Sequence, residues 1–275
     1  MKTIDVRHQE LLYPCVRVRT PKAGGSGTVI YSSKVPKSDD YETYLLTNHH
    51  VVENCIRIEK KWNALLQREV KSDVRSTVDT EFFRYKWQSR NVGATQIQAD
   101  VVAYDKDQDI ALLKLRDTTP QPYIAKLYPR DAENKLFIFT PVFAVGAALG
   151  HPPVVTSGHI SGFGDEIDNY EFWLSTAPTI FGNSGGAIFL QETSEFIGIP
   201  SRISVVMIGF GGDAITHLSY FIPITRIYKF LEEQIFQFIY DPAFTSLQCE
   251  KLREKKREEE EQRLVSRDHK GEDED

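Results

Sequence analysis

Ser184 lies in a glycine-rich segment, where residues 182–186 read Gly-Asn-Ser-Gly-Gly. A serine hydroxyl is a weak nucleophile near neutral pH, so it needs a base to take its proton and an acid to hold that base. His50 and Asp109 precede the serine and offer these two functions. The glycines let the backbone turn tightly, so that the amides of Gly182 and Ser184 could donate hydrogen bonds to a developing oxyanion.

Each of these residues also has a structural interpretation. A short glycine- and serine-rich segment alone is equally typical of an ordinary turn between two strands. His49 has the same claim as His50 on composition, and a lone histidine at a strand end is more often structural. Asp105 and Asp107 compete with Asp109, but we interpret them as turn residues because only Asp109 begins an apolar run.

Short β-branched and aromatic runs, separated by Gly, Pro and polar turns, dominate the middle of the chain. This pattern predicts an all-β barrel or sandwich rather than alternating strands and helices. We expect the strands at residues 28–31, 44–47, 99–104, 110–115, 137–140, 143–145, 154–160, 170–175, 187–190, 196–199 and 204–208.

Helical patterns occur in two segments and continue into the C-terminal tail. Residues 60–71 contain good helix formers and predict a helix between His50 and Asp109. Apolar residues at helical spacing predict an amphipathic helix over 225–247 that packs on the body of the protein. From 248 to 275 charged residues dominate, which predicts a solvated helix that frays into a partly disordered acidic end.

The bulk composition narrows the class of protein. The chain has 275 residues, of which 41% are hydrophobic, so a packed core is possible. The net charge of −6 offers no basic face, and we expect no nucleic-acid partner. No apolar run approaches the ~20 residues that would cross a bilayer, so we expect no membrane span. The sequence does not indicate the oligomeric state.

The cysteines and the N-terminal residues indicate the cellular location that we expect for the protein. The three cysteines, Cys15, Cys55 and Cys249, are scattered and odd in number. This argues against a disulfide framework and against a metal cluster. The first residues lack the apolar run of a secretory signal, so we expect a cytoplasmic location.

Several segments together resemble trypsin-like serine peptidases of the chymotrypsin fold, and most closely the protease domain of the HtrA/Deg-type branch. The base segment reads Thr-Asn-His-His-Val-Val at 47–52 and the acid segment reads Asp-Ile-Ala-Leu-Leu-Lys at 109–114. The register of the first motif selects His50 over His49. The resemblance covers about residues 24–238 and rests on segments 25–30, 47–52, 109–114, 155–161, 182–186 and 220–224.

The resemblance implies a fold and a domain organisation. We expect an all-β, chymotrypsin-like double six-stranded β-barrel with a C-terminal helix and a helical insertion in the first barrel. The expected boundaries are 1–128 for the first barrel with its insertion at about 60–96, 129–224 for the second, 225–247 for the helix and 248–275 for the charged tail. We expect no peptide-binding PDZ domain, because too little chain follows the second barrel.

The resemblance also implies a reaction. Ser184 would be the nucleophile, His50 the general base and later acid, and Asp109 the residue that orients His50. The amides of Gly182 and Ser184 would form the oxyanion hole. The expected function is that of a serine endopeptidase, which hydrolyses protein or peptide substrates through an acyl-enzyme without a metal or organic cofactor.

The substrate pocket is expected just ahead of the serine and on the strand near residue 200. No carboxylate precedes Ser184 where a pocket selective for Arg or Lys would carry one, so we expect an uncharged or apolar preferred side chain. Arg202 would favour acidic side chains instead if it points inward. The expected lining residues are Pro178, Thr179, Ile180, Phe181, Pro200, Ser201 and Arg202.

Two other functions stay open. Residues 182–186 also match the nucleophile elbow of α/β-hydrolases, which requires a helix after the serine and an acid and a histidine downstream. Residues 187–190 look strand-like instead, and the downstream pair of Asp213 and His217 leaves little chain to complete a sheet. The second possibility is a protease fold that serves as a catalytically inactive binding module.

Overall fold

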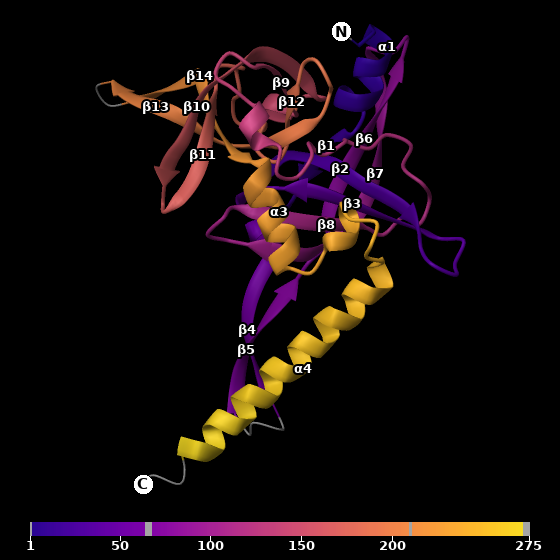
Figure 1. Cartoon of the computed structure of the whole chain (residues 1–275), viewed down its shortest axis with the longest axis vertical. Helices are drawn as coiled ribbons and strands as arrows, with labels where there is room; N and C mark the ends of the chain where they lie inside the picture. The colour runs from indigo at the N-terminus through magenta and orange to yellow at the C-terminus, as the bar shows by residue number, and fades with distance from the viewer. Residues whose placement is uncertain (1, 64–67, 209–210, 272–275) are drawn as a thin grey trace.

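Two β-barrels form the body of the molecule. The computed structural model describes residues 2–63, 68–208 and 211–271, and within these ranges it contains two closed six-stranded barrels side by side (Figure 1). The first has the strand order β1-β2-β3-β8-β7-β6 and the second β10-β11-β14-β13-β12-β9. The predicted all-β double barrel is confirmed.

The strands of the first barrel are β1 Cys15–Arg19, β2 Gly24–Lys34, β3 Tyr41–Thr47, β6 Val78–Lys86, β7 Arg90–Asp105 and β8 Ile110–Leu115. Those of the second are β9 Pro141–Gly146, β10 Val154–Ile167, β11 Tyr170–Ser175, β12 Ala187–Leu190, β13 Phe196–Ile208 and β14 Gly211–Pro223. A hairpin outside the barrels consists of β4 Ile56–Asn63 and β5 Arg68–Arg75. The helices are α1 Ile4–Arg7, α2 His49–Val52, α3 Ile224–Glu233 and α4 Ser246–Gly271, with the short turns η1 His8–Leu12, η2 Glu53–Cys55, η3 Glu133–Lys135, η4 Ala148–Gly150 and η5 Gln237–Ile239.

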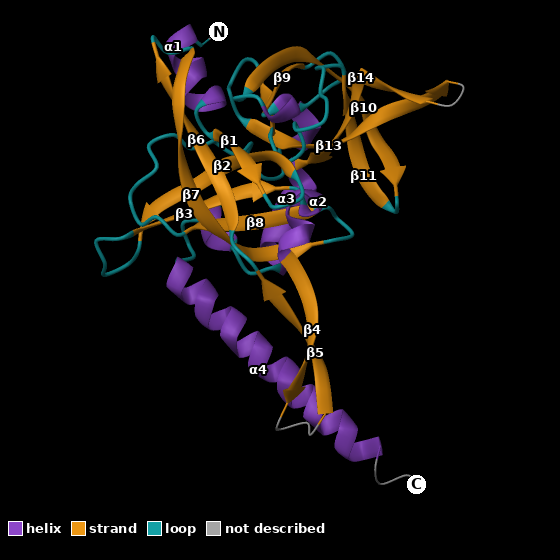
Figure 2. Cartoon of the chain, turned by 180° about the vertical axis from the view of Figure 1, so that it is seen from behind, coloured by secondary structure: helices purple, strands orange, loops and turns teal. Residues whose placement is uncertain are grey.

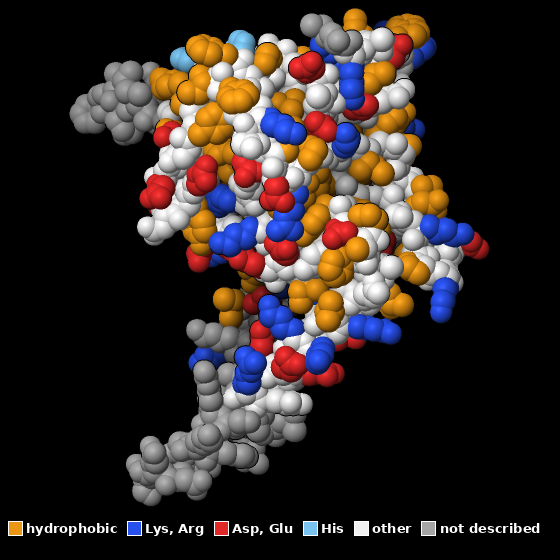
Figure 3. Space-filling model, in the orientation of Figure 1, with side chains coloured by type: hydrophobic (Ala, Val, Ile, Leu, Met, Phe, Trp, Pro, Cys, Tyr) orange, Lys and Arg blue, Asp and Glu red, His pale blue; other side chains and the backbone are white. Residues whose placement is uncertain are grey.

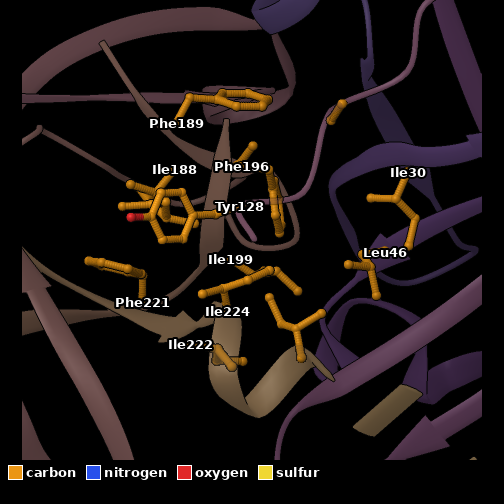
Figure 4. Close-up of a cluster of buried hydrophobic side chains, with 14 of the residues drawn as sticks. Ile30, Leu46, Tyr128, Ile188, Phe189, Phe196, Ile199, Phe221, Ile222 and Ile224 are labelled. Carbon is orange, nitrogen blue, oxygen red and sulfur yellow. The ribbon is translucent and has the colours of Figure 1, made fainter. Parts of the chain in front are cut away.

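Strands β3 and β8 are buried on both faces, which explains their continuous apolar runs. Successive side chains of a strand point to opposite faces. Leu45 belongs to the core inside the first barrel, whereas Leu46 belongs to the core shared with the second barrel and the C-terminal helices. Figure 4 shows Leu46 and Ile30 facing the cluster around Phe196 of the second barrel. The two barrels are therefore held together by one continuous apolar core.

The predicted helical insertion is wrong. Residues 60–63 end β4 and residues 68–71 begin β5, with Lys60 paired to Lys71 in antiparallel register, while 64–67 lie outside the described residues. The hairpin projects from the first barrel (Figure 1). The later part of the expected insertion is a barrel strand, because β6 pairs with β1 and closes the first barrel.

The C-terminal helix prediction also needs correction, because the expected single helix over 225–247 is interrupted. α3 ends at Glu233, Ile235 takes a positive φ of 60°, and the amide of Phe236 donates to Leu231 O at 2.7 Å. This is the pattern of a helix end with a left-handed residue. The charged tail forms α4, which extends from the body in the same direction as the hairpin (Figure 2), and residues 272–275 lie outside the described part.

The start of α4 is attached to the body. Cys249 is fully buried, and the guanidinium of Arg253 lies 4.1 Å from the centroid of the Phe236 ring. Arg253 also donates to Ile235 O at 2.5 Å. The helix is therefore fixed at its first turns, whereas the side chains of residues 254–260 that follow are exposed.

One further expectation is wrong, and one alternative fold is excluded. Residues 137–140 form a turn rather than a strand, and Phe139 within it is 81% exposed with a φ of 77°. An α/β-hydrolase is excluded, because the segment after Ser184 is strand β12 and the fold is a double barrel.

Candidate active site

The pairing of β3 with β8 brings His50 and Asp109 together. The two strands are antiparallel with Thr47 opposite Ala111, so the residues after β3 and those before β8 lie at the same end of the barrel. His50 follows in the short helix α2, and Asp109 directly precedes β8. Two positions far apart in the sequence therefore meet through ordinary strand register.

Hydrogen bonds orient the imidazole of His50. Its Nδ1 lies 2.9 Å from Oδ1 and 2.9 Å from Oδ2 of Asp109, and its backbone amide donates to Oδ1 at 3.0 Å. An ionised carboxylate only accepts hydrogen bonds, so Nδ1 carries the proton. The lone pair then lies on Nε2, which is free to accept a proton.

The carboxylate of Asp109 is also fixed from other directions. Ser201 Oγ donates to Oδ2 at 2.6 Å, and Asn48 Nδ2 donates to the Asp109 backbone carbonyl at 2.8 Å. Burial by itself would raise the pKa of Asp109, but the hydrogen bonds from His50 and Ser201 hold that pKa below its ordinary value. Asp109 therefore stays ionised beside the imidazole at neutral pH.

The structure separates the two adjacent histidines. His49 is buried with its ring 5.3 Å from that of Tyr104, and burial lowers its pKa. His50 is the member of the pair that faces Asp109. Asp107 lies in the turn between β7 and β8, as expected, whereas Asp105 is the last residue of β7, and its carboxylate accepts hydrogen bonds from the backbone and side chain of Gln108 in that turn.

Ser184 lies on a loop that main-chain contacts hold between the two barrels. Its carbonyl oxygen accepts from Ser26 N at 2.8 Å, and the Gly185 amide donates to Pro200 O of β13. Ser26 Oγ donates to Gly182 O at 2.6 Å and accepts from Ala147 N at 2.7 Å. One serine of the first barrel therefore ties together two loops of the second.

Glycine is required at position 185 of this loop. Gly185 has a φ of 84°, and a Cβ there would lie 2.2 Å from Ser26 O and 2.4 Å from Thr47 Oγ1. Any side chain would therefore both strain the backbone and push the loop away from the first barrel. The conformation next to Ser184 depends on this close approach.

The side chain expected to be the nucleophile and the amides expected to form the oxyanion hole have free hydrogen-bonding groups. Within the described part of the chain, Ser184 Oγ forms no hydrogen bond, and neither do the backbone amides of Gly182 and Ser184. Catalytic hydrogen bonds in enzymes without substrate are often long and tighten only in the complex. The arrangement leaves these groups available to a bound carbonyl.

The residues expected to line a substrate pocket differ in exposure and in the groups that they contact. Phe181 is 67% exposed, whereas Thr179 is buried with Oγ1 2.6 Å from Ser219 Oγ. Ser201 is directed at Asp109, a role that the sequence did not suggest. Arg202 pairs with Asp168 at 2.7 Å and lies over the Phe172 ring. The remaining positions supply main-chain contacts: Pro178 O accepts from Thr156, Ile180 N donates to Asn183, and Pro200 O accepts from Gly185.

Arg226 of α3 is a buried charged residue that supports the turn containing Gln108 and Asp109. It donates to Gln108 O at 2.8 Å and to Glu171 O at 2.9 Å, and its guanidinium lies 4.8 Å from the Tyr170 ring centroid. Burial lowers the pKa of Arg226 to about 10, so it remains charged near neutral pH. The only sequence signal for it was an arginine on the apolar side of a helix.

No metal or membrane site adds to this arrangement in the residues that the structure describes. Among them there is no group of His, Cys, Asp and Glu side chains that could hold a metal ion. No described helix is both long and apolar enough to cross a bilayer. Cys15, Cys55 and Cys249 are buried free thiols.

The chain is similar to several known proteases. It is 31% identical over 186 residues to a probable serine protease do-like from Buchnera aphidicola subsp. Acyrthosiphon pisum (strain APS), a match that covers 66% of this chain and 30% of the relative. It is 30% identical over 183 residues to the periplasmic serine endoprotease DegP of Salmonella typhimurium, covering 65% of this chain and 30% of that protein. The chain thus spans under a third of the length of these relatives.

A solved structure shares the fold. The HtrA-type protease AlgW with tripeptide has a TM-score of 0.57 and 20% sequence identity, and the match covers 85% of this chain and 63% of that one. The expected cytoplasmic location is contradicted, because the Salmonella relative is named as periplasmic. A model of the trypsin-like peptidase domain matches residues 25–199, more than half of the chain, and the chain therefore belongs to the trypsin-like peptidase family.

Proposed function

We propose that the chain is a serine endopeptidase that hydrolyses peptide bonds through an acyl-enzyme. Ser184 is the nucleophile, His50 the general base and acid, and Asp109 the residue that orients His50. The observation that carries the proposal is the contact of His50 Nδ1 with both carboxylate oxygens of Asp109 at 2.9 Å. That contact leaves Nε2 as the proton acceptor, which is the state a general base requires.

The reaction follows from these positions. Ser184 Oγ attacks the scissile carbonyl carbon while His50 Nε2 takes the hydroxyl proton, and Asp109 stabilises the resulting imidazolium. The amides of Gly182 and Ser184 donate to the oxyanion, a contribution of about 3 kcal/mol for each donor in related chemistry. His50 then passes its proton to the leaving amine, and water hydrolyses the ester by the reverse sequence.

A fluorophosphonate probe tests the nucleophile, because it reacts with activated serines. We expect the wild-type protein to be labelled, and Ser184→Ala and His50→Ala to lose the label. Ser76→Ala is the matched control, because Ser76 is an exposed serine whose hydroxyl makes no hydrogen bond among the described residues. Labelling that persists in Ser184→Ala would place the reactive serine elsewhere.

A catalytically inactive binding module is the second candidate function. It is favoured by the absence of a hydrogen bond between Ser184 Oγ and His50 Nε2 in the described structure. A folded wild-type protein that stays unlabelled and leaves unfolded casein intact would support this alternative. Labelling together with casein cleavage would exclude it.

The proposal includes a preference for uncharged side chains before the scissile bond. None of the residues at 178–181 and 200–202 carries a carboxylate, and the one cation among them, Arg202, is paired with Asp168. Cleavage sites in a peptide library should therefore be rich in uncharged side chains at this position. A profile dominated by Lys or Arg would refute the preference.

A further inference from the structure

A cavity of about 620 Å³ lies beside the serine loop. On one side it is lined by residues of β1, the turn that follows and the first residues of β2. On the other side it is lined by Leu149, Gly150, Phe181 and Gly182 of the second barrel. The cavity thus lies between the barrels and includes Gly182, which the proposed function makes an oxyanion donor.

The place of the cavity relative to Ser184 decides which part of a substrate could reach it. Gly25 lines the cavity, and an atom at its Cβ position would lie 2.9 Å from Ser184 O and 2.6 Å from Val51 Cγ2, next to His50. The loop contacts β13 through the Gly185 amide instead. The proposed function assigns the side chain before the scissile bond to residues 178–181 and 200–202, and of these only Phe181 also lines the cavity. The cavity is therefore left mainly for the segment that departs with the new amino terminus.

The cavity is strongly cationic. Arg17, Arg19 and Lys22 line it, and no lining residue, all of which lie in the described ranges, carries a carboxylate. Glu81 pairs with both Arg17 and Arg19, so this single carboxylate is shared by two of the three cations. This differs from the chain as a whole, which has a net charge of −6 and intermixed acidic and basic side chains on the face in Figure 3.

The three cations differ in how firmly they are held. Arg17 is fixed by Glu81, by the carbonyl of Gly150 and by the Phe83 ring 5.5 Å from its guanidinium. The side chain of Arg19 is 60% exposed with a single contact to Glu81 at 3.1 Å. Lys22 is exposed and forms no ion pair or hydrogen bond with the rest of the described chain. Arg19 and Lys22 therefore have donors left for an incoming ligand.

We propose that this cavity binds the peptide segment that follows the scissile bond and selects acidic side chains there. The inference rests on the proposed peptidase function. Carboxylates are the peptide groups that form charge-assisted hydrogen bonds with arginine and lysine. Since exposed ion pairs are weak and screened by salt, each contact should change kcat/KM by at most about fivefold, and less at high ionic strength.

Internally quenched peptides provide the test. A series shares all residues before the scissile bond and carries Glu, Gln or Lys at one of the first three positions after it. At low salt, the wild-type protein should cleave the best Glu peptide about fivefold faster in kcat/KM than its Gln counterpart, with Lys slowest. The ratio should fall toward one in 1 M salt, where the screening length is about 3 Å.

Variants identify the residues responsible. Arg19→Gln and Lys22→Gln should each lower the ratio of kcat/KM for the Glu peptide to kcat/KM for the Gln peptide. The double variant Arg19→Glu/Lys22→Glu should cleave the Lys peptide faster than the Glu peptide. Lys135→Gln, an exposed lysine on η3, should leave the ratio unchanged. A change in the overall activity of a variant does not affect the result, because the ratio compares kcat/KM for two peptides with the same variant.

The outcomes separate this inference from the proposed function. Fluorophosphonate labelling and peptide cleavage with no preference for Glu, or with a preference that survives both substitutions, would overturn the cavity assignment alone. Absence of labelling and cleavage in the wild-type protein would overturn both. A Glu preference that disappears in Arg19→Gln and Lys22→Gln, but not in Lys135→Gln, supports the assignment.

Discussion

The two halves of the candidate active site are held by different means. The first barrel supplies His50 and Asp109, which side-chain hydrogen bonds fix to each other and to Ser201. The second barrel supplies Ser184, whose loop is positioned through main-chain groups, the Asn183 side chain and the buried hydroxyl of Ser26. Removing a side chain should therefore impair catalysis in the first half, whereas the second half should lose stability when a side chain is added to the loop or when the Ser26 hydroxyl is removed.

The largest effect is expected from Asp109→Asn. The amide cannot hold the His50 tautomer with a free Nε2, and kcat should fall about 10⁴-fold, as is typical of this substitution in Ser-His-Asp enzymes. Hydrolysis of a casein-derived peptide measures the change. The control is Asp107→Asn, an exposed carboxylate in the same turn. A loss below tenfold in Asp109→Asn would mean that the first half does not depend on this carboxylate.

Gly185→Ala tests the opposite expectation for the second half. The new Cβ would meet Ser26 O at 2.2 Å, so we expect a loss of more than about 1 kcal/mol in the free energy of unfolding and about 10²-fold in kcat. Urea unfolding and peptide hydrolysis measure these. Gly164→Ala is the control, since its φ of 76° is similar but nothing lies within 4 Å of its Cβ position. Equal losses in both variants would assign the effect to backbone strain alone.

Two serine-to-alanine changes compare the halves directly. Ser201→Ala removes one hydrogen bond from a charged carboxylate, which predicts a drop of about tenfold in kcat with little change in stability. Ser26→Ala leaves Gly182 O and Ala147 N without their partner, which predicts a loss of about 1–3 kcal/mol in unfolding free energy. A loss that is mainly of stability in Ser201→Ala and mainly of kcat in Ser26→Ala would contradict the comparison.

The smallest effect concerns His49, which burial keeps neutral while its neighbour His50 contacts the acid. A folded-state pKa below 6.5 means that the unfolded chain binds the proton more readily, so stability is present above pH 6.5 and falls as the pH drops through that value. His49→Gln should reduce this loss between pH 7.5 and 5.5, as measured by urea unfolding. His217→Gln, on the exposed part of β14, should not. An unchanged pH profile in His49→Gln would show that burial does not set this titration.

The sequence predicted those elements whose pattern reflects burial. Strands at 44–47 and 110–115 were visible because both faces are buried and the run is continuous. The β4–β5 hairpin was missed because it projects from the body, so Ile58 and Trp62 are each 66% exposed and helix formers dominate its composition. The break at Ile235 was missed because a β-branched residue rarely takes a positive φ. Asp241 and Pro242, by contrast, were available as signals that the helix could not continue to 247.

Within the candidate site, residue types singled out His50, Asp109 and Ser184, because few other side chains can serve as base, acid and nucleophile, and the structure brings the first two into contact. Ser201 was placed in a pocket, since a serine directly after a proline carries no sign of the distant carboxylate that it contacts. Ser26 was visible only as part of a Gly-Ser-Gly segment. Supporting residues of this kind depend on long-range contacts between the barrels, which local patterns do not encode.

The double burial of β3 has a consequence for how the strand finds its alignment. Leu45 and Leu46 face different cores, so sliding the strand by one residue would still put a leucine at one of these two positions, whereas Tyr44 or Thr47 would enter the other. Polar groups at the strand end add to the selection of the correct pairing: Thr47 Oγ1 donates to Ser26 O at 2.7 Å, and Asn48 donates to Asp109 O at 2.8 Å. The alignment of the barrel and the placement of His50 beside Asp109 thus depend on the same few atoms.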